Sequence, residues 1–343
     1  MKYFFLLILL FPTSLFGAEC LNDVKKSKTF SLYFENDLFG NTDKGYTNGT
    51  KLSWVSDDLT GYAESGRLPK WSLPYVEKIP FINKPGLQRN ITLSLGQNMY
   101  TPEDIECKEL IKDDRPYAGW TYVGAAFHSK NYSYLDSLEI QIGIVGPESF
   151  AEQTQKFIHR IRNSQRPNGW GHQLKNEPGL ALIYDHKTRV LCANHRGIDI
   201  DAITHIGGAI GNVYTFADTG MEVRWGLNIP SDFGTSLIRP SGDSNAPVTA
   251  QDPRISCYNN FSLYMFTMIN GYVMLHNIFL DGNTFTDSHS VDKKYFVGEI
   301  GAGIGMVYHR YKLSYAHILR TKEFNHQDSS AQFFGSLTFS FTY

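Results

Sequence analysis

The chain ends in SLTFSFTY, residues 336–343, where small polar and apolar side chains alternate strictly. Alternation with a period of two places every second side chain on the same face of a β-strand. One face of this strand is therefore Ser and Thr, and the other carries Leu337, Phe339, Phe341 and Tyr343. Small polar side chains suit a crowded barrel lumen, whereas an aromatic face suits lipid and its interfacial girdle. The segment predicts a strand of a membrane-spanning β-barrel.

The same alternation recurs from end to end of the chain. Phe30, Leu32 and Phe34 share one face near the start, as do Ile91 and Leu93 further on. A soluble sandwich with its apolar face inward would alternate as well, but its polar face would not need small residues and its apolar face would not end in an aromatic residue.

The alternation rule gives about twelve strands. They span approximately residues 29–37, 46–56, 89–100, 117–129, 134–146, 178–191, 196–213, 218–228, 257–280, 292–308, 309–320 and 331–343. An even number closes a bacterial barrel with both termini on the periplasmic side. We therefore expect an all-β fold, a twelve-stranded antiparallel transmembrane β-barrel with an extracellular helix.

Composition agrees with a β-rich membrane protein and excludes other classes. The 343 residues include 20 Tyr, 23 Phe and 30 Gly, and aromatic residues favour strands. Mean hydropathy is only −0.29, and after the N-terminus no window holds the roughly 18 apolar residues that a spanning helix needs. The net charge of −2, without a basic block, gives no sign of nucleic-acid binding. The four cysteines form no C-x-x-C pair, so a zinc site is not indicated and their disulfide state is open.

The N-terminus is typical of an export signal. Lys2 precedes an apolar run from Tyr3 to Phe11 that is too short to span a bilayer, and small residues follow up to Ala18. We expect a signal peptide at residues 1–18 and an outer-membrane β-barrel domain at residues 19–343.

The period changes between the fifth and sixth predicted strands. Ser149 and Glu152 have the spacing of a capping box, and residues 150–163 suit a helix that ends before Pro167 and Gly169. Because the first strand runs outward from the periplasm, this connection lies outside the cell.

Candidate chemistry gathers where the first two strands meet. Residues 34–40 and 43–49 concentrate carboxylates, amides and a hydroxyl, which are oxygen ligands that suit calcium, although a polar turn would look the same. Asn36 shares the outward parity of Phe34, so it must be covered in the membrane. The predicted helix is the natural cover, and its His159 is a candidate general base. His172 competes for that role.

These residues carry a resemblance to the outer-membrane lipid A 3′-O-deacylase family over essentially the whole mature chain. The matching stretches are Glu35-Asn36-Asp37, Tyr46-Thr47-Asn48-Gly49, Asp114-Arg115-Pro116-Tyr117-Ala118-Gly119, His159-Arg160-Ile161, Gly169-Trp170, Gln173-Leu174, Asn176-Glu177-Pro178 and Asn277-Ile278-Phe279-Leu280-Asp281-Gly282. The resemblance implies a calcium-dependent enzyme of the outer membrane whose active site lies between the barrel wall and an extracellular helix and faces outward. Its substrate would be the 3′-linked acyloxyacyl ester of lipid A in lipopolysaccharide.

The resemblance also assigns roles to single residues. It implies that His159 is the general base, and that Asn36, Asp37 and Thr47 are essential near the ion, with Asp37 as its ligand. A glutamate can stand six residues after the histidine in this family, and here that supporting position is Gln165. The candidates for gripping lipid A phosphate are Lys108, Lys112 and Arg115.

Two other functions fit parts of the pattern. A serine hydrolase of the outer-membrane phospholipase type would need a nucleophile such as Ser164, but the chain has no G-x-S-x-G elbow. A structural or transport barrel would use the polar rim to bind divalent ions that bridge lipopolysaccharide phosphates.

Overall fold

The computed structural model describes residues 23–37, 45–59, 66, 68–79, 84–163, 165–235, 237–238, 243–327 and 331–343, without the side chains of residues 45–47. The expected signal peptide lies outside these residues. Within them, twelve antiparallel strands form one closed barrel in which each strand pairs with its neighbours in sequence and β1 pairs with β12. The predicted all-β, twelve-stranded antiparallel barrel is confirmed.

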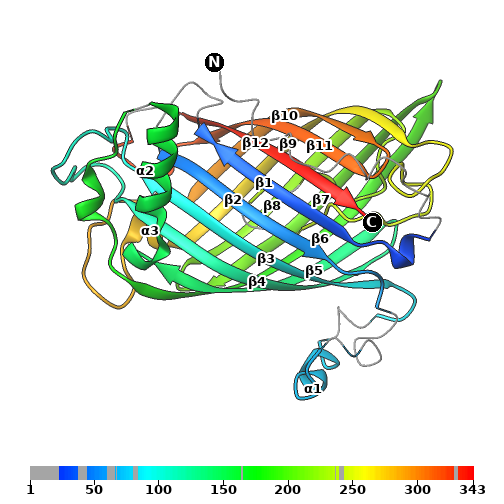
Figure 1. Ribbon diagram of the computed structural model, residues 1–343, viewed down its shortest axis with the longest axis horizontal. Coiled ribbons are helices and arrows are strands. Elements are labelled where there is room, and N and C mark those ends of the chain that lie inside the picture. The colour runs from blue at the N-terminus through cyan, green and yellow to red at the C-terminus, as the bar shows by residue number, and fades with distance from the viewer. Residues whose placement is uncertain are drawn as a thin grey trace.

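The strands follow one another as a simple meander, tilted to the long axis of the barrel (Figure 1). Their bounds are β1 Thr29–Asn36, β2 Gly45–Val55, β3 Gln88–Thr101, β4 Ala118–Lys130, β5 Tyr134–Val145, β6 Glu177–His195, β7 Ile198–Gly211, β8 Tyr214–Leu227, β9 Phe261–Asn277, β10 Phe296–Tyr308, β11 Tyr311–Thr321 and β12 Ala331–Thr342.

The helices mark the two ends of the barrel. Helices α2 (Ala151–Arg162) and α3 (Ile278–Asp281) lie at one end, called the α2 end below (Figure 1). The other end, called the terminal end, carries the first and last described residues, and there the backbone N–H of Lys28 donates to the carbonyl of Tyr343 at 2.8 Å. Helix α1 (Leu73–Val76) belongs to the β2–β3 connection on that side. No helix in the described ranges is long and apolar enough to cross a membrane.

Several predicted boundaries are wrong. β6 continues to His195, β8 begins at Tyr214 and β10 begins only at Phe296. The predicted strand 257–280 is too long at both ends. Residues 278–280 belong to α3, and residues 257–260 do not extend β9, because Ser256 Oγ accepts the backbone N–H groups of Tyr258 and Asn259 and turns the chain. The capping box at Ser149 does not form either. Ser149 Oγ donates to the carbonyl of Gly146 at 2.6 Å, and Phe150 takes a left-handed conformation with φ 58° before α2 begins.

The two faces of the wall follow the predicted parity. Outward side chains such as Leu93, Val123 and Ile142 are 51%, 60% and 58% exposed. On the inner face, the hydroxyls of Ser31 and Ser340 hydrogen-bond across β1 and β12 at 3.0 Å. Toward the α2 end the lumen is more aromatic than the last strand predicts, because Trp120, Tyr122 and other large rings are buried inside it.

The connection between β8 and β9, residues 228–260, folds back into the lumen, and we call it the lumenal segment. Its described residues bond to strands around the barrel. The backbone N–H of Ile238 donates to Glu35 of β1 at 2.8 Å, Lys187 of β6 donates to Ser244 at 3.3 Å, and Lys312 of β11 donates to Asp232 at 2.6 Å. No pattern in the sequence predicts this segment, whose described residues lie against strands on the inner face of the barrel.

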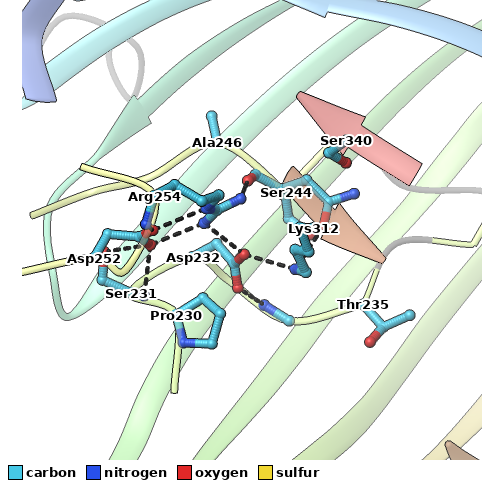
Figure 2. A network of polar contacts seen from close by, with 12 residues as sticks. Pro230, Ser231, Asp232, Thr235, Ser244, Ala246, Asp252, Arg254, Lys312 and Ser340 are labelled. Atoms are coloured by element: carbon cyan, nitrogen blue, oxygen red, sulfur yellow. Dashed lines mark hydrogen bonds and ion pairs between the residues drawn. The ribbon is translucent and has the colours of Figure 1, made fainter. Parts of the chain in front are cut away.

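Buried charges hold the lumenal segment in place (Figure 2). The Asp232 carboxylate is fully buried and pairs with Arg224 at 2.7 Å, Arg254 at 2.9 Å and Lys312 at 2.6 Å. Burial raises the pKa of Asp232, but Lys312, Arg254 and Arg224 outweigh it and hold that pKa well below its usual value. The carboxylate therefore stays ionised under ordinary conditions.

Replacing Asp232→Asn should lower the free energy of unfolding by about 3–5 kcal/mol, because three buried cations lose their shared partner. Urea unfolding in detergent, followed by tryptophan fluorescence, measures the change. A carboxyl group whose pKa is lower in the folded than in the unfolded chain stabilises the fold at pH values above the unfolded pKa of about 3.9. This stabilisation is lost as pH falls through the folded pKa. The difference from the native chain should therefore be constant at neutral pH and disappear in strong acid. Exposed Asp287→Asn is the control, and equal unfolding midpoints for Asp232→Asn and the native chain would contradict the anchoring role.

Candidate active site

The site begins where β1 ends. Asn36 is the last residue of β1 and lies on the outward parity of Phe30 and Leu32, both of which are exposed. Asn36 is nevertheless only 3% exposed, and Asp37 after it only 1%. A polar side chain on the lipid-facing side is tolerated only where protein covers it. Something must therefore lie over the outside of the wall at this rim.

Strand register extends this rim into a row across four strands. Asn36 is opposite Asn48 of β2, Asn48 is opposite Met99 of β3, and Met99 is opposite Gly119 of β4. At Gly119 an added Cβ would collide with Ser149 Oγ and Ala151 Cβ. The start of α2 thus rests directly on the wall at the β4 end of the row.

Helix α2 lies across the strand ends on the outside of the wall (Figure 1). Its buried residues, Ala151, Gln155 and His159, are spaced by four and form one face. Ala151 packs with Met99 of the row. His159 is about 12 Å further along the helix at about 1.5 Å per residue, which equals about two and a half strand spacings of about 4.8 Å. This length is enough for a helix that starts on β4 to carry His159 past β3 toward β2 and β1, where Asn48 and Asn36 are.

Hydrogen bonds fasten the helix to the wall. Gln97 of β3 and Thr121 of β4 both donate to the carbonyl of Ser149 at 2.7 Å. On the other side, Trp170 Nε1 donates to Gln155 Oε1 at 2.7 Å, and both side chains are buried. The helix is thus held between the strands and the segment that follows it, which makes its position a property of the fold.

The histidine is held in a defined tautomer. His159 is 4% exposed, and its Nδ1 lies 2.5 Å from the carbonyl oxygen of Gln165. A carbonyl only accepts, so Nδ1 carries the proton of the neutral ring and Nε2 keeps a lone pair. This is the form that a general base needs. Gln165 supports the histidine through its backbone, so a glutamine in place of glutamate leaves this contact unchanged.

The remaining predicted residues fall in different places. Lys108 and Lys112 are exposed in the β3–β4 connection, which reaches the segment after α2 through a bond from Asn168 N–H to the Ile105 carbonyl at 2.8 Å. Arg115 is different, because it is 1% exposed and pairs with Glu323 at 2.6 Å. A buried, paired guanidinium is not free to grip a phosphate, so we correct that expectation.

Two candidates cannot be placed with their side chains. Thr47 lies in β2 at an irregularity between Tyr46 and Asn48, but its side chain is outside the described part, and so is Ser164. His172, the competing base, is exposed beyond α2.

The donors at this rim fit a hard cation in type. Asp37, Asn36 and Asn48 bring buried carboxylate and amide oxygens to one edge, and calcium prefers such ligands. Among the described residues, no group of three or more His, Cys, Asp or Glu side chains is arranged to hold a metal. An ion here would therefore depend on amide, backbone and water oxygens beside Asp37.

With this geometry in hand, comparison with known proteins is informative. A family model described as "Outer membrane protein LpxR" matches residues 4–343. The chain belongs to the LpxR family. None of the curated proteins compared with it matches.

Solved structures agree with the family. LpxR from Salmonella typhimurium superposes with a TM-score of 0.70 at 17% identity, covering 91% of this chain and 99% of that one, which shows a shared fold. The β domain of the Bordetella autotransporter BrkA (8% identity, 92% and 97% covered) and the NalP translocator domain from Neisseria meningitidis (7%, 92% and 87% covered) reach TM-scores of only 0.38 and 0.34. We infer nothing from these two.

Sequence reasoning missed several residues of this LpxR-family site. Gln97 shares the outward parity of Leu93 and Leu95, so it carries the same signal that singled out Asn36. Gln155 and Trp170 have no such signal, because their contact depends on how the chain turns back after α2.

Replacing Gln155→Leu should loosen α2, because the buried Trp170 N–H then loses its acceptor at a cost of about 1–3 kcal/mol. Hydrogen exchange of the α2 amides in detergent should become roughly 10- to 100-fold faster, since 1.4 kcal/mol is a factor of ten in an opening equilibrium. Lys156→Leu, on the exposed side of the same helix, is the matched control. Unchanged exchange in Gln155→Leu would show that the contact does not hold the helix.

Proposed function

We propose that this chain is a carboxylic ester hydrolase, a calcium-dependent lipid A 3′-O-deacylase that removes the 3′-linked acyloxyacyl chain from lipopolysaccharide in the outer leaflet. Membership of the LpxR family supports this proposal. The observation that carries it is His159, buried on the wall side of α2 with Nδ1 on a carbonyl and Nε2 left as a base. A barrel that served only as a wall would not need this arrangement.

The position of the site favours a lipid substrate. The polar row lies on the outside of the barrel wall, so its substrate would arrive from the bilayer and not from the lumen. The side of α2 that faces away from the wall mixes apolar and basic side chains: Phe157 and Ile161 are 59% and 69% exposed, and Lys156 and Arg160 beside them are exposed too. Large apolar side chains next to basic ones suit a surface where acyl chains meet anionic headgroups. The lumenal segment also favours this reading over transport, because its described residues bond to strands around a lumen that a pore would need to keep open.

The proposed orientation places the α2 end outside the cell. Bacterial outer-membrane barrels keep their termini and short turns in the periplasm and their longer loops outside. The terminal end holds the first and last described residues and the short β4–β5, β6–β7 and β10–β11 turns. The two long connections at that end, β2–β3 and β8–β9, pack against the wall and enter the lumen, whereas those at the α2 end carry α2 and α3. The site would then meet the lipopolysaccharide leaflet.

The chemistry we propose is direct hydrolysis without a covalent intermediate. His159 Nε2 takes a proton from water as the water oxygen adds to the ester carbonyl carbon. The bond between the acyl carbon and the 3′-oxygen of the sugar then breaks, and the imidazolium returns the proton to this departing oxygen. The products are a free 3′-hydroxyl and a carboxylic acid, so atoms and charges balance.

The rim residues would stabilise the charge that develops on the carbonyl oxygen. The candidate donors close to Asp37 in sequence or strand register are the amides of Asn36 and Asn48 and the hydroxyl of Thr47. One such donor to the oxyanion typically stabilises the transition state by about 2.7–4 kcal/mol. Calcium, when bound with Asp37 among its ligands, would polarise the same carbonyl. Lys108 and Lys112 remain the exposed candidates for lipid A phosphate.

Replacing His159→Gln should reduce acyl release by about 10²–10⁴-fold, because the base is lost while the barrel remains intact. Mass spectrometry of lipid A from cells that express the variant measures the deacylated product. His172→Gln is the matched control and should retain activity. Full acyl release by His159→Gln, or its loss only in His172→Gln, would rule out His159 as the base.

Removing calcium with a chelator should also stop acyl release, and calcium should restore it better than magnesium, which demands stricter octahedral geometry. A second measurement is independent of activity: calcium should raise the thermal stability of the native chain in proportion to its binding. Asp37→Ala should abolish that shift. A calcium-independent enzyme with no stability shift would remove the ion from the proposal.

A further inference from the structure

Outward side chains on β3, β4 and β5 mark where the wall meets lipid near the terminal end. Register aligns them in three successive rows, which are Ile91, Phe127 and Leu138, then Leu93, Ala125 and Ile140, then Leu95, Val123 and Ile142. The third row is at least half exposed, and in the second row Leu93 and Ile140 are exposed as well. The first row is not open in this way, although it has the same parity.

The first row is covered by the chain between β2 and β3. Leu68, Val76 and Ile79 pack with Ile91, Phe127 and Leu138 in one apolar cluster that also includes Leu59. Figure 1 shows α1 beside the barrel wall, displaced away from the axis, and not simply beyond the end of the barrel. Residues 68–79, which we call the foot, therefore cover the wall one row from the surface that lipid covers. Two residues of strand advance about 6.8 Å, so the foot lies at the edge of the lipid belt.

The foot exposes aromatic and basic side chains. Trp71 is 75% exposed and Tyr75 is 71% exposed, while Lys70 and Lys78 beside them are exposed too. Large exposed rings are unfavourable in water, but Trp and Tyr are enriched where a bilayer meets water because each has an apolar body and a polar edge. Lysines add attraction to anionic headgroups.

The rest of this rim supplies the same kind of side chain from the wall. Trp54, Phe30, Phe341 and Tyr311 form one row across β2, β1, β12 and β11. Trp54 also donates from Nε1 to the hydroxyl of Tyr343 at 3.1 Å. On β3 the same row continues with Leu93, and the wall becomes aliphatic there. The foot thus presents exposed rings beside a part of the wall whose row of Leu93, Ala125 and Ile140 has none.

We propose that residues 68–79 dock on the phospholipid surface of the leaflet at the terminal end, with Trp71 and Tyr75 at the level of the headgroups. The foot continues the aromatic girdle around β3–β5 and fixes the depth of the barrel on that side. This role does not depend on the proposed enzymatic function, because it concerns the opposite end of the molecule.

The test uses the full chain in phospholipid vesicles that contain lipids brominated either near the headgroup end or near the terminus of their acyl chains. The difference in tryptophan fluorescence between the native chain and Trp71→Phe gives the emission of Trp71. We expect the shallow bromine to quench this contribution at least about twofold more than the deep bromine, as for an interfacial ring. The double variant Trp71→Phe/Tyr75→Trp moves the fluorescent ring to position 75. The emission of this new tryptophan should also be quenched more strongly by the shallow bromine than by the deep one.

Trp54→Phe is the control, since Trp54 lies on the lipid-facing wall and its contribution must be quenched by brominated lipid in any case. Deacylation of lipid A, if present, should be unchanged in Trp71→Phe. A Trp71 contribution that neither brominated lipid quenches, and that aqueous iodide quenches fully, would overturn the proposal and place the foot in water. Equal or stronger quenching by the deep bromine would overturn the headgroup level.

Discussion

Hydrogen bonding of the backbone inside a bilayer is the constraint from which this structure follows. Lipid offers no partners to exposed N–H and C=O groups, so strands can cross only if the sheet closes on itself. Pairing of β1 with β12 meets that condition. Closure then gives the wall an outer and an inner face, and every side chain on a strand must suit either lipid or the lumen. Alternation along the chain is the direct result.

The candidate site depends on a local exception to this division. Asn36, Asn48, Gln97 and Thr121 are polar on outward positions at the α2 end. Their exposure to lipid would be costly. Gln97 and Thr121 avoid it by donating to the Ser149 carbonyl just before α2, and Asn36 and Asn48 are buried as well. The small and polar face of α2, which carries His159, is its buried face. Tolerance of polar groups on the wall and burial of this histidine thus occur at the same end of the barrel.

The lumen is organised by a different balance. Buried ions are expensive unless they are paired, and Asp232 with Arg224, Arg254 and Lys312 satisfies this requirement by joining the lumenal segment to strands on different sides of the barrel. Arg115 and Glu323 form another such pair toward the α2 end. These pairs tie the lumenal segment and the strands together across the interior of the barrel.

The number of strands, their approximate positions and the outward position of Asn36 were predictable from residue order, because a period of two is a local property that neighbouring residues express together. The helix at 151–162 and its His159 were predictable for the same reason. The inward fold of residues 228–260, the burial of Arg115, the backbone role of Gln165 and the contact between Gln155 and Trp170 were not. Each of these joins residues whose separation in the chain has no fixed relation to their distance in space, and neither alternation nor helical period encodes such a pairing. Closure of the barrel brings residues 228–260 and Arg115 to their partners, and the turn of the chain after α2 brings Gln165 and Trp170 to theirs.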